Sequence, residues 1–193
     1  MKPRPETRIA RLPLAAGDLL SGTRLVNLEE ELERHHADCF AWAMTCCGRD
    51  RSEAEDVLQS SYLKVLDGHA VFGGRSTFRT WLFGVIRRTA GEHRRRRMLR
   101  GLWVGAALDE VEAADPAPDP AALVALSETS TRLLGALERL PRRQRELLHL
   151  VFYQDLTIQD AAAVIGVSLG TARTHFERGK KRLRGWLGAE DRP

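Results

Sequence analysis

The stretch TIQDAAAVIGVSLGTARTHFER, residues 157–178, predicts two short helices joined by a tight turn. Thr157 followed by Asp160 is the start signal of a capping box, and Gly166 is a stop signal for the first helix. Ser168 is placed to cap the second helix. Apolar residues recur at helical spacing in the first helix, at Ile158, Ala161, Ala162 and Ile165, and give it one apolar face. This pattern is typical of a helix-turn-helix, whose second helix lies in the major groove of DNA.

The second helix of this pair has a polar and cationic outer face. The residues predicted to face inward are Val167, Ala172, Phe176 and Leu183, and those predicted to face DNA are Ser168, Thr171, Arg173, Thr174, Glu177, Arg178 and Lys181. Small residues permit close approach to the groove, while Arg and Thr side chains bond to base edges and phosphates. An ordinary helical hairpin with a solvated charged face is the alternative interpretation of this segment.

Charge is unevenly distributed along the 193 residues, whose formal net charge is +4. Residues 87–100 contain seven Arg and one Glu, and residues 132–184 contain eleven Lys or Arg against five Asp or Glu. Residues 101–127 contain five acidic residues and neither Lys nor Arg. We therefore expect two nucleic-acid contacts separated by a connector that avoids DNA, and the run Arg94–Arg97 predicts phosphate contacts. A solvated face is the alternative for each basic block.

The chain is expected to be all-α, with two small helical domains joined by a flexible acidic linker. The run DPAPDP at residues 115–120 cannot be helical, because each Pro lacks a donor and restricts its predecessor. The expected parts are a flexible N-terminal tail (1–23), a first domain (24–100), the linker (101–127), a second domain containing the helix-turn-helix (128–187) and a C-terminal tail (188–193).

Three helices are expected in the first domain, near residues 28–47, 52–67 and 76–97. Ser52 with Glu55 suggests a capping box for the second helix. Its predicted buried stripe comprises Ala54, Val57, Leu58, Tyr62, Val65 and Leu66, which leaves Asp56, Gln59 and Ser60 exposed. The third helix is expected to bury Phe78, Trp81, Leu82, Val85 and Ile86. In the second domain, Pro141 is expected in the first turn of a helix that runs to Tyr153.

Five residues in the first predicted helix could supply soft metal ligands: His35, His36, Cys39, Cys46 and Cys47. The stronger interpretation is an apolar ladder in which cysteine behaves as a small buried hydrophobe, formed by Leu32, His36, Phe40, Met44 and Cys47. An odd number of clustered cysteines argues against a disulfide framework. No metal site and no cofactor are therefore predicted, and sensing of metal or redox state is left open.

Other classes of protein find little support. No segment approaches the roughly 18 to 20 apolar residues of a membrane span, and the run from Leu12 to Leu20 is too short for a secretory signal, so we expect a cytoplasmic protein. The sequence has no phosphate-binding Gly loop, no carboxylates at metal-ligand spacing and no nucleophile beside a base, so no enzymatic activity is predicted.

Three motifs resemble the extracytoplasmic-function sigma factors of the sigma-70 family, in order and in spacing. They are AEDVLQSSYLKVL (Ala54–Leu66), FRTWLFGVIRRTAGEHRRRR (Phe78–Arg97) and the segment Leu137–Leu183, which contains the helix-turn-helix. The resemblance implies a sigma-2 domain that binds the clamp helices of the largest subunit of bacterial core RNA polymerase and melts the −10 element. It also implies a sigma-4 domain that binds the flap of the second-largest subunit and reads the −35 element of promoter DNA. An anti-sigma factor is an implied inhibitor.

The resemblance also assigns roles to individual residues. Asp56 and Gln59 match exposed positions of the polymerase-binding helix, and Trp81 matches a tryptophan expected mainly in the core. The outward residues of the second helix in residues 157–178 match positions that face the −35 element. The residues expected to contact the −10 element or its phosphates are Arg87, Arg88, Arg94, Arg95, Arg96 and Arg97.

This chain departs from the family pattern at four positions. Arg88 stands where the family usually has an Asn that helps to hold a flipped −10 base, and Gly84 stands where Arg is usual. Ser60 replaces a common acidic residue, and His175 replaces a common Arg. A guanidinium lacks the paired donor and acceptor of an amide, so we expect an altered −10 preference.

Two other classes of function remain as alternatives. A transcription regulator of the response-regulator type has a similar helix-turn-helix, but it would need a doubly wound receiver domain, and the first hundred residues show no alternating strands. A sigma-like interaction protein that no longer initiates transcription is compatible with Gly84, Arg88 and Ser60.

Overall fold

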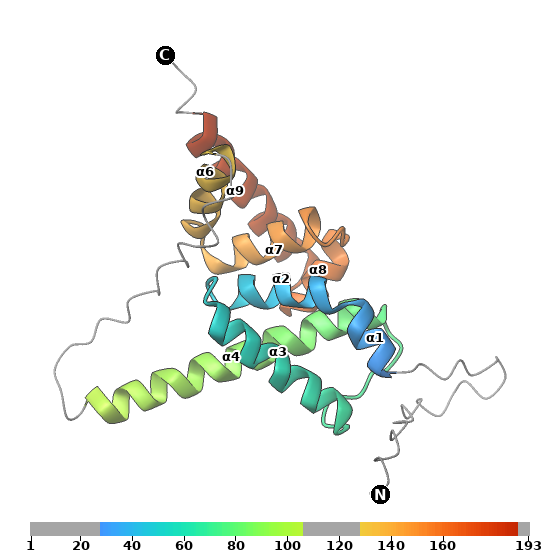
Figure 1. Ribbon diagram of the computed structural model, residues 1–193. Helices are drawn as coiled ribbons and strands as arrows, with labels where there is room; N and C mark the ends of the chain where they lie inside the picture. Colours follow the sequence, from blue (N-terminus) through green and yellow to red (C-terminus); the bar gives the residue numbers. More distant parts are fainter. Residues whose placement is uncertain (1–27, 106–127, 189–193) are drawn as a thin grey trace, which may run out of the picture.

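The computed structural model describes residues 28–105 and 128–188, and within these ranges every regular element is a helix (Figure 1). The N-terminal bundle comprises α1 (Leu28–Arg34), α2 (His36–Cys46), α3 (Arg51–Leu66) and α4 (Phe78–Gly105). The C-terminal bundle comprises α6 (Glu128–Glu138), α7 (Arg142–Phe152), α8 (Ile158–Ile165) and α9 (Leu169–Gly188). The prediction of an all-α fold is confirmed. The expected tail of residues 1–23 and the linker beyond Gly105 lie outside the described residues.

The helix-turn-helix has the caps that its sequence predicts. The Thr157 hydroxyl accepts a hydrogen bond from the backbone N–H of Asp160 at 3.1 Å and donates one to its carboxylate at 2.6 Å. Gly166 ends α8 in the left-handed region with φ 68°, a conformation that glycine adopts at little cost. At the start of α9, the hydroxyl of Ser168 accepts a hydrogen bond from the backbone N–H of Thr171 at 3.2 Å.

The cap predicted for the second helix of the first domain was wrong. Asp50, not Ser52, precedes α3, and its carboxylate accepts a hydrogen bond from the backbone N–H of Glu53 at 2.9 Å. Both Asp and Ser are good N-caps, so composition alone does not distinguish them. Leu66, predicted to be buried, is 38% exposed, because it lies with Leu63 on the exposed side of α3, whereas the adjacent Val65 is buried.

The predicted single helix over residues 28–47 is divided at His35 into α1 and α2. Consequently the buried face of α2 differs from the predicted ladder, in which His36 proves exposed and Phe40 and Met44 half-buried. The buried residues of α2 are Cys39, Trp42, Ala43 and Cys46. Trp42 is fully buried and donates a hydrogen bond from its indole N–H to the backbone oxygen of Phe83, 2.9 Å away. Trp81, which was expected mainly in the core, is only half-buried and packs against the core from its edge.

Helix α4 is longer than predicted and continues to Gly105, into the range expected to be linker. Its first half packs against α2, α3 and α8 through Leu82, Phe83, Val85 and Ile86. Its second half extends beyond the bundle (Figure 1). Residues 95–100 of this extension are all exposed.

Helix α9 lies close against α7 at Gly179. A methyl group built at this position would lie only 3.0 Å from the Cδ1 atom of Leu148 and 3.3 Å from the Cβ atom of Gln144. Glycine therefore permits the approach of the two helices, although it costs about 1 kcal/mol within a helix. Pro141 precedes α7 as its N-cap residue, one position before the predicted first turn.

The two bundles pack directly on each other. Helix α2 contacts α3 and α4 on one side and α7 on the other, and α4 also contacts α8 (Figure 1). One continuous hydrophobic core contains Trp42 and Phe83 from the N-terminal bundle together with Leu147, Leu150 and Ile165 from the C-terminal bundle. We call this contact region between α2 and α4 on one side and α7 and α8 on the other the seam.

A buried carboxylate lies in the seam. Glu146 of α7 is fully buried, and its two oxygens accept hydrogen bonds from Arg87 Nε at 3.0 Å and from Arg142 Nε at 2.7 Å. Arg87 belongs to the N-terminal bundle and Arg142 to the C-terminal bundle. A buried charge is tolerated only when it is paired and hydrogen-bonded, so both guanidinium groups are needed to hold Glu146 here.

Replacing Glu146 should destabilise the protein strongly. We expect Glu146→Ala to lower the free energy of unfolding by about 3 kcal/mol, because it leaves two guanidinium groups without their shared carboxylate. Urea unfolding followed by circular dichroism at pH 7 measures this change. The matched control is Glu138→Ala, which removes the half-exposed partner of Arg49 at 3.3 Å and should cost less than about 1 kcal/mol. Equal effects of the two substitutions would contradict the role of the buried pair.

Candidate nucleic-acid interface and partner surfaces

Helix α9, the second helix of the helix-turn-helix, exposes its predicted contact face. Thr171, Arg173, Thr174, Glu177, Arg178 and Lys181 are all exposed, as is Ser168 before the helix. The inward positions are also as predicted, with Ala172 and Phe176 buried and Val167 and Leu183 half-buried. Within the described part of the chain, Arg173, Arg178 and Lys181 have no ion pair. Their positive charges are therefore available to an anionic partner.

Other residues of α9 are held by intramolecular contacts. Glu177 pairs with Lys180 at 2.9 Å, and the Lys180 ammonium also lies 4.8 Å from the centre of the Phe176 ring. The Thr174 hydroxyl donates to the backbone oxygen of Gly170 at 3.0 Å. Helical periodicity places Glu177 and Thr174 outward, but it does not show that a side chain already engages Glu177 or that a backbone oxygen already engages Thr174.

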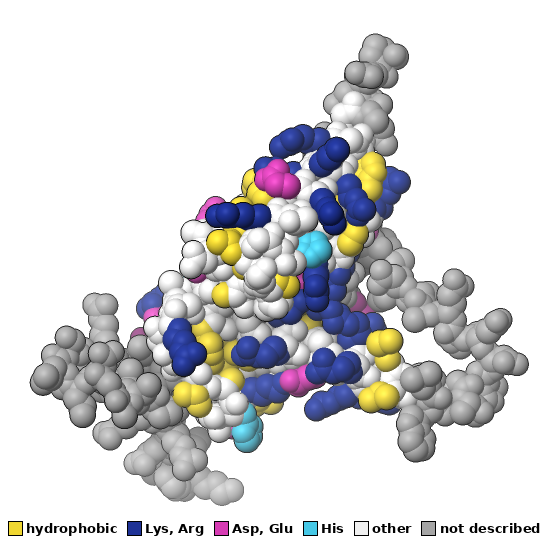
Figure 2. Space-filling model, turned by 180° about the vertical axis from the view of Figure 1, so that it is seen from behind, with side chains coloured by type: hydrophobic (Ala, Val, Ile, Leu, Met, Phe, Trp, Pro, Cys, Tyr) yellow, Lys and Arg dark blue, Asp and Glu magenta, His cyan; other side chains and the backbone are white. Residues whose placement is uncertain are grey.

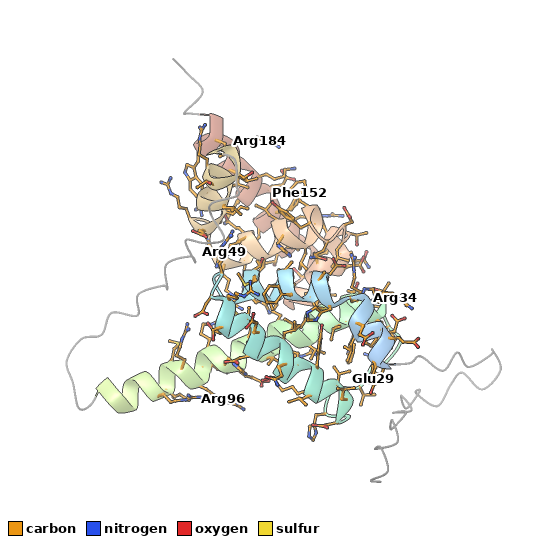
Figure 3. The ribbon with its side chains drawn as sticks, viewed as in Figure 1. Glu29, Arg34, Arg49, Arg96, Phe152 and Arg184 are labelled. Atoms are coloured by element: carbon orange, nitrogen blue, oxygen red, sulfur yellow. The ribbon has the colours of Figure 1, made fainter. Side chains whose placement is uncertain are left out.

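The basic residues of α4 fall into two groups. Arg87 is engaged with Glu146 in the seam, and Arg97 pairs with Glu53 at 2.9 Å. Arg88, Arg95 and Arg96 are exposed and make no ion pair with any other described residue. Figure 3 shows Arg96 on the part of α4 that extends beyond the bundle. The structure thus leaves part of the predicted phosphate-binding set available and uses the rest internally.

Lys and Arg side chains of both bundles share one face of the molecule. Figure 2 shows them spread from the C-terminal bundle to the extension of α4, with few Asp or Glu side chains among them. Such a face attracts polyanions through long-range electrostatics and through release of counterions.

The exposed side of α3 has a different character. Leu63 and Leu66 are 51% and 38% exposed, and they line a cavity of about 580 Å³ together with Phe40, Leu58 and Gln59. Asp56 is exposed on the same helix but does not line this cavity. An apolar centre with a polar rim is the usual composition of a protein interface. Sequence reasoning found the polar rim of this surface and missed its two exposed leucines.

Comparison with known proteins supports one family throughout the described chain. Residues 32–100 match the family model "Sigma-70 region 2", and residues 130–183 match "Sigma-70, region 4". The chain is 30% identical over 155 residues to the ECF RNA polymerase sigma factor RpoE of Cereibacter sphaeroides, covering 80% of this chain and 83% of that one. It is 29% identical over 154 residues to the ECF sigma factor SigX of Bacillus subtilis, covering 79% of each chain. The chain belongs to the extracytoplasmic-function sigma factors.

Solved structures agree with this assignment. The sigma factor RpoE of Bartonella quintana, in complex with the anti-sigma factor NepR, is 25% identical and superposes with a TM-score of 0.67, covering 86% of this chain and 99% of that one. CnrH, in complex with the cytosolic domain of CnrY, is 19% identical with a TM-score of 0.60, covering 87% and 92% of the two chains, and shows the likeness of fold.

The sigma factor has a large apolar cavity beside the seam. Its volume is about 640 Å³, and it lies between α2, α6, α7 and α9. Leu134, Leu148 and Leu183 contribute to its lining, while Phe152 and Tyr153 at its edge are 61% and 58% exposed. Figure 3 places Phe152 on the C-terminal bundle and Arg49 where the two bundles meet.

The thiols of the sigma factor are poor candidates for reactive or ligating groups in this fold. Burial raises the pKa of Cys39 and of Cys47 to about 12, and burial also raises the pKa of Cys46 well above its usual value. The thiolate is the form that binds metals and reacts with oxidants. Among the described residues, no group of three or more His, Cys, Asp or Glu side chains is arranged to hold a metal ion. None of the described helices combines the length and the apolar character that crossing a membrane requires.

His149 lies in the seam as a neutral side chain. Its Nδ1 atom is 3.0 Å from the Thr45 hydroxyl, and its Nε2 atom is 3.3 Å from the amide nitrogen of Gln154. Because the Gln154 nitrogen can only donate, Nε2 accepts and the ring proton resides on Nδ1. The ring also lies 5.5 Å from those of Trp42 and Tyr153. Burial lowers the pKa of His149 to about 4, against an opposing effect of the Asp38 charge.

The stability of this sigma factor should therefore fall in mild acid. An unfolded histidine titrates near pH 6.5, so between about pH 6.5 and 4 the unfolded state binds a proton that the folded state excludes. Lowering the pH from 7 to 5 should cost about 2 kcal/mol through His149 alone, while well above pH 6.5 it contributes no pH dependence. Urea unfolding at pH 5 and 7 measures the change. The His149→Gln variant should lose less stability than the parent over this interval, and identical pH dependence would show that His149 is not buried as a neutral group.

Proposed function

We propose that this sigma factor brings bacterial core RNA polymerase to its promoters through three separate surfaces. The outer face of α9 reads the −35 element, the basic side of α4 holds the opened −10 region, and the exposed side of α3 binds the polymerase. The observation that carries the proposal is the set of unpaired cations on α9, Arg173, Arg178 and Lys181, on a capped helix that docks closely against α7 at Gly179. A fixed helix with free cations is what major-groove reading requires.

The α3 surface supports a protein contact. Leu63 and Leu66 would supply its apolar centre and Gln59 its rim, with Asp56 beside it. Burying exposed apolar area of this kind contributes about 25 cal/mol per Å². The clamp helices of the largest polymerase subunit are the proposed partner, and α9 with its neighbours would approach the flap of the second-largest subunit.

On α4, Arg88 and Arg94–Arg96 are the proposed contacts to the opened strand and its phosphates. Arg97 and Arg87 are already paired with Glu53 and Glu146, respectively, so they bring less free charge to such a contact. Each phosphate contact that forms should steepen the plot of the logarithm of the binding constant against the logarithm of the salt concentration by about one.

An anti-sigma factor is the proposed inhibitor. The relatives RpoE and CnrH were solved with an anti-sigma factor and with the CnrY cytosolic domain, respectively. In this chain, the 640 Å³ cavity with the exposed Phe152 and Tyr153 offers an apolar surface to such a partner. Pull-downs from cells test this proposal. Recovery of polymerase alone under all conditions would favour control by the amount of sigma factor.

Run-off transcription with purified core polymerase on genomic fragments tests the central proposal. The polymerase supplies the chemistry of RNA synthesis, so the sigma factor should direct transcription to start at specific promoters without being an enzyme itself. In the cell we expect it to act in the cytoplasm. Polymerase binding without any specific start would identify a sigma-like interaction protein. The described residues contain no strand, so nothing in them supports a receiver domain of a response regulator.

Charge reversal on α3 should abolish polymerase binding. We expect Asp56→Arg combined with Gln59→Ala to remove co-purification with core polymerase and to leave the helical circular dichroism unchanged, because both side chains are exposed. Glu30→Arg is the control, since it makes the same change of charge on the exposed side of α1, outside the α3 cavity. Retained binding by the double variant would rule out this surface.

Alanine substitutions of Arg173 and Arg178 should separate base reading from phosphate binding. A bidentate contact to a base contributes about 1 to 3 kcal/mol of discrimination, whereas loss of a phosphate contact weakens binding to every sequence and reduces the salt slope by about one. One variant should relax the base preference at one or two −35 positions. The other should keep that preference and reduce the salt dependence of binding.

The measurement is holoenzyme binding to a library of −35 variants across a salt series. Lys180→Ala is the control, because the Lys180 ammonium is already occupied by Glu177 and the Phe176 ring and should change the slope less. If both arginine variants bind and discriminate like the parent, α9 does not enter the groove.

A further inference from the structure

The apolar cavity of about 640 Å³ beside the seam has a charged end and an apolar end. At the charged end, the Nε atom of Arg49 lies 3.3 Å from a carboxylate oxygen of Glu138, and Arg145 donates to the backbone oxygen of Glu138 at 3.2 Å. Phe152 lies two helical turns beyond Arg145 on α7, which is about 10 Å along the helix axis. Accordingly, Arg49 and Phe152 lie well apart in Figure 3. The cavity therefore has the polarity of an amphiphile, with one charged and one apolar end.

The charged end has more cationic than anionic groups. Two guanidinium groups face one carboxylate there, which leaves an excess of positive charge. The bond from Arg145 to the backbone of Glu138 is the only hydrogen bond that either guanidinium makes to the described residues, and the buried Nε atoms of Arg49 and Arg145 have no hydrogen-bond partner. A guanidinium has five N–H donors in a planar fork that matches a carboxylate. Donors at this end are therefore available to an anionic acceptor.

The turn between α2 and α3 positions Arg49. Its φ is 71°, in the left-handed region that is unfavourable for a residue with a side chain. The backbone N–H of Arg49 donates to the backbone oxygen of Met44 at 2.8 Å, and that of Asp50 donates to the backbone oxygen of Cys47 at 3.2 Å. These bonds fix the backbone from which the Arg49 side chain reaches the cavity.

The rest of the lining is mainly apolar. Its polar members Thr45 and His149 are hydrogen-bonded to each other at 3.0 Å. Each of the four surrounding helices contributes an apolar side chain, namely Met44 from α2, Leu134 from α6, Leu148 from α7 and Leu183 from α9. Each methylene group of a ligand that is buried among such side chains improves its dissociation constant about fourfold.

We propose that this cavity binds a single-chain fatty acid, with its carboxylate at Arg49 and Arg145 and its hydrocarbon chain directed toward Phe152. The cavity volume is within the range of small-molecule sites. A neutral amphiphile would leave the guanidinium donors without a charged acceptor, and a cationic one would be repelled. The fatty acid would contact α2 of the N-terminal bundle and three helices of the C-terminal bundle, so it would stabilise their packing. It would also exclude a protein partner from the same cavity.

The test is isothermal titration calorimetry of the full chain with octanoate, decanoate and dodecanoate, each below its micelle concentration, at pH 7. The dissociation constant should fall about fourfold for each added methylene until the cavity is filled. Decanol should bind about tenfold more weakly than decanoate, because it cannot form charge-assisted hydrogen bonds with the guanidinium groups.

Substitutions at the charged end should change the affinity for decanoate in opposite directions. Arg49→Gln should weaken the binding of decanoate about tenfold and leave that of decanol unchanged. Glu138→Gln should strengthen the binding of decanoate severalfold, because it removes the carboxylate that competes for Arg49. A general effect on folding would instead change the binding of both ligands alike.

A substitution on α2 tests where the hydrocarbon chain lies. Ala41 is exposed and lines the cavity, so Ala41→Trp would fill part of the cavity without disturbing the core. Ala37→Trp is the matched control, because Ala37 is exposed one turn earlier on α2 and lies outside the lining. Ala41→Trp should bind decanoate severalfold more weakly than the parent, and Ala37→Trp should bind it like the parent.

Three outcomes would overturn the inference. If decanoate does not bind the parent, the cavity is left to a protein partner. If decanoate and decanol bind alike, or Arg49→Gln binds decanoate like the parent, the cavity does not recognise the carboxylate. If Ala37→Trp and Ala41→Trp weaken binding equally, the fatty acid attaches elsewhere on the surface. None of these measurements uses polymerase or DNA, so they succeed or fail independently of the proposed function.

Discussion

The paired carboxylate of Glu146 is the interaction on which the arrangement of the two bundles depends. A fully buried charge costs several kcal/mol of desolvation, which only close and well-oriented partners offset. One partner, Arg142, comes from the same helix, and the other, Arg87, comes from α4 of the opposite bundle. Glu146 therefore fixes α7 against α4, whereas hydrophobic contacts, being non-directional, would permit sliding. The neutral His149 adds a second directional contact to the same seam.

This arrangement determines which candidate residues are accessible. The α3 surface and the outer face of α9 both lie away from the seam, so packing of the bundles leaves them exposed. Arg87 is different, because its guanidinium is one of the two partners of the buried Glu146. A movement of Arg87 that broke this bond would leave Glu146 with Arg142 alone. Arg88, the adjacent residue, forms no ion pair with any described residue.

Local signals in the sequence predicted the local features of this structure well. The caps at Thr157 and Gly166 and the two faces of α9 follow from hydrogen bonding and helical spacing within a few residues. The division at His35 and the exposure of Leu66 depend on how neighbouring helices pack, which no local pattern contains. The same holds for the full burial of Trp42, which lies outside the predicted apolar ladder, and for the half-burial of Trp81, because only tertiary packing decides which side chain is enclosed. The partnership of Arg87 with Glu146 joins residues 59 positions apart, and charge counting treated both as surface groups.

The glycines inside the long helices differ in whether close helix packing explains them. Each costs about 1 kcal/mol relative to alanine in a helix interior. At Gly179 the close packing of α9 on α7 accounts for the glycine, because a methyl group there would lie only 3.0 Å from Leu148. At Gly84 no packed neighbour is present, and the nearest group is the guanidinium of Arg88.

Gly91 repeats this pattern further along α4. A methyl group placed on it would lie 3.7 Å from a guanidinium nitrogen of Arg95 and 3.9 Å from one of Arg94. Packing therefore does not account for Gly84 and Gly91, because a methyl group at either position would make only ordinary van der Waals contacts with guanidinium nitrogens. Alanine at both positions should thus stabilise α4 by about 1 kcal/mol each.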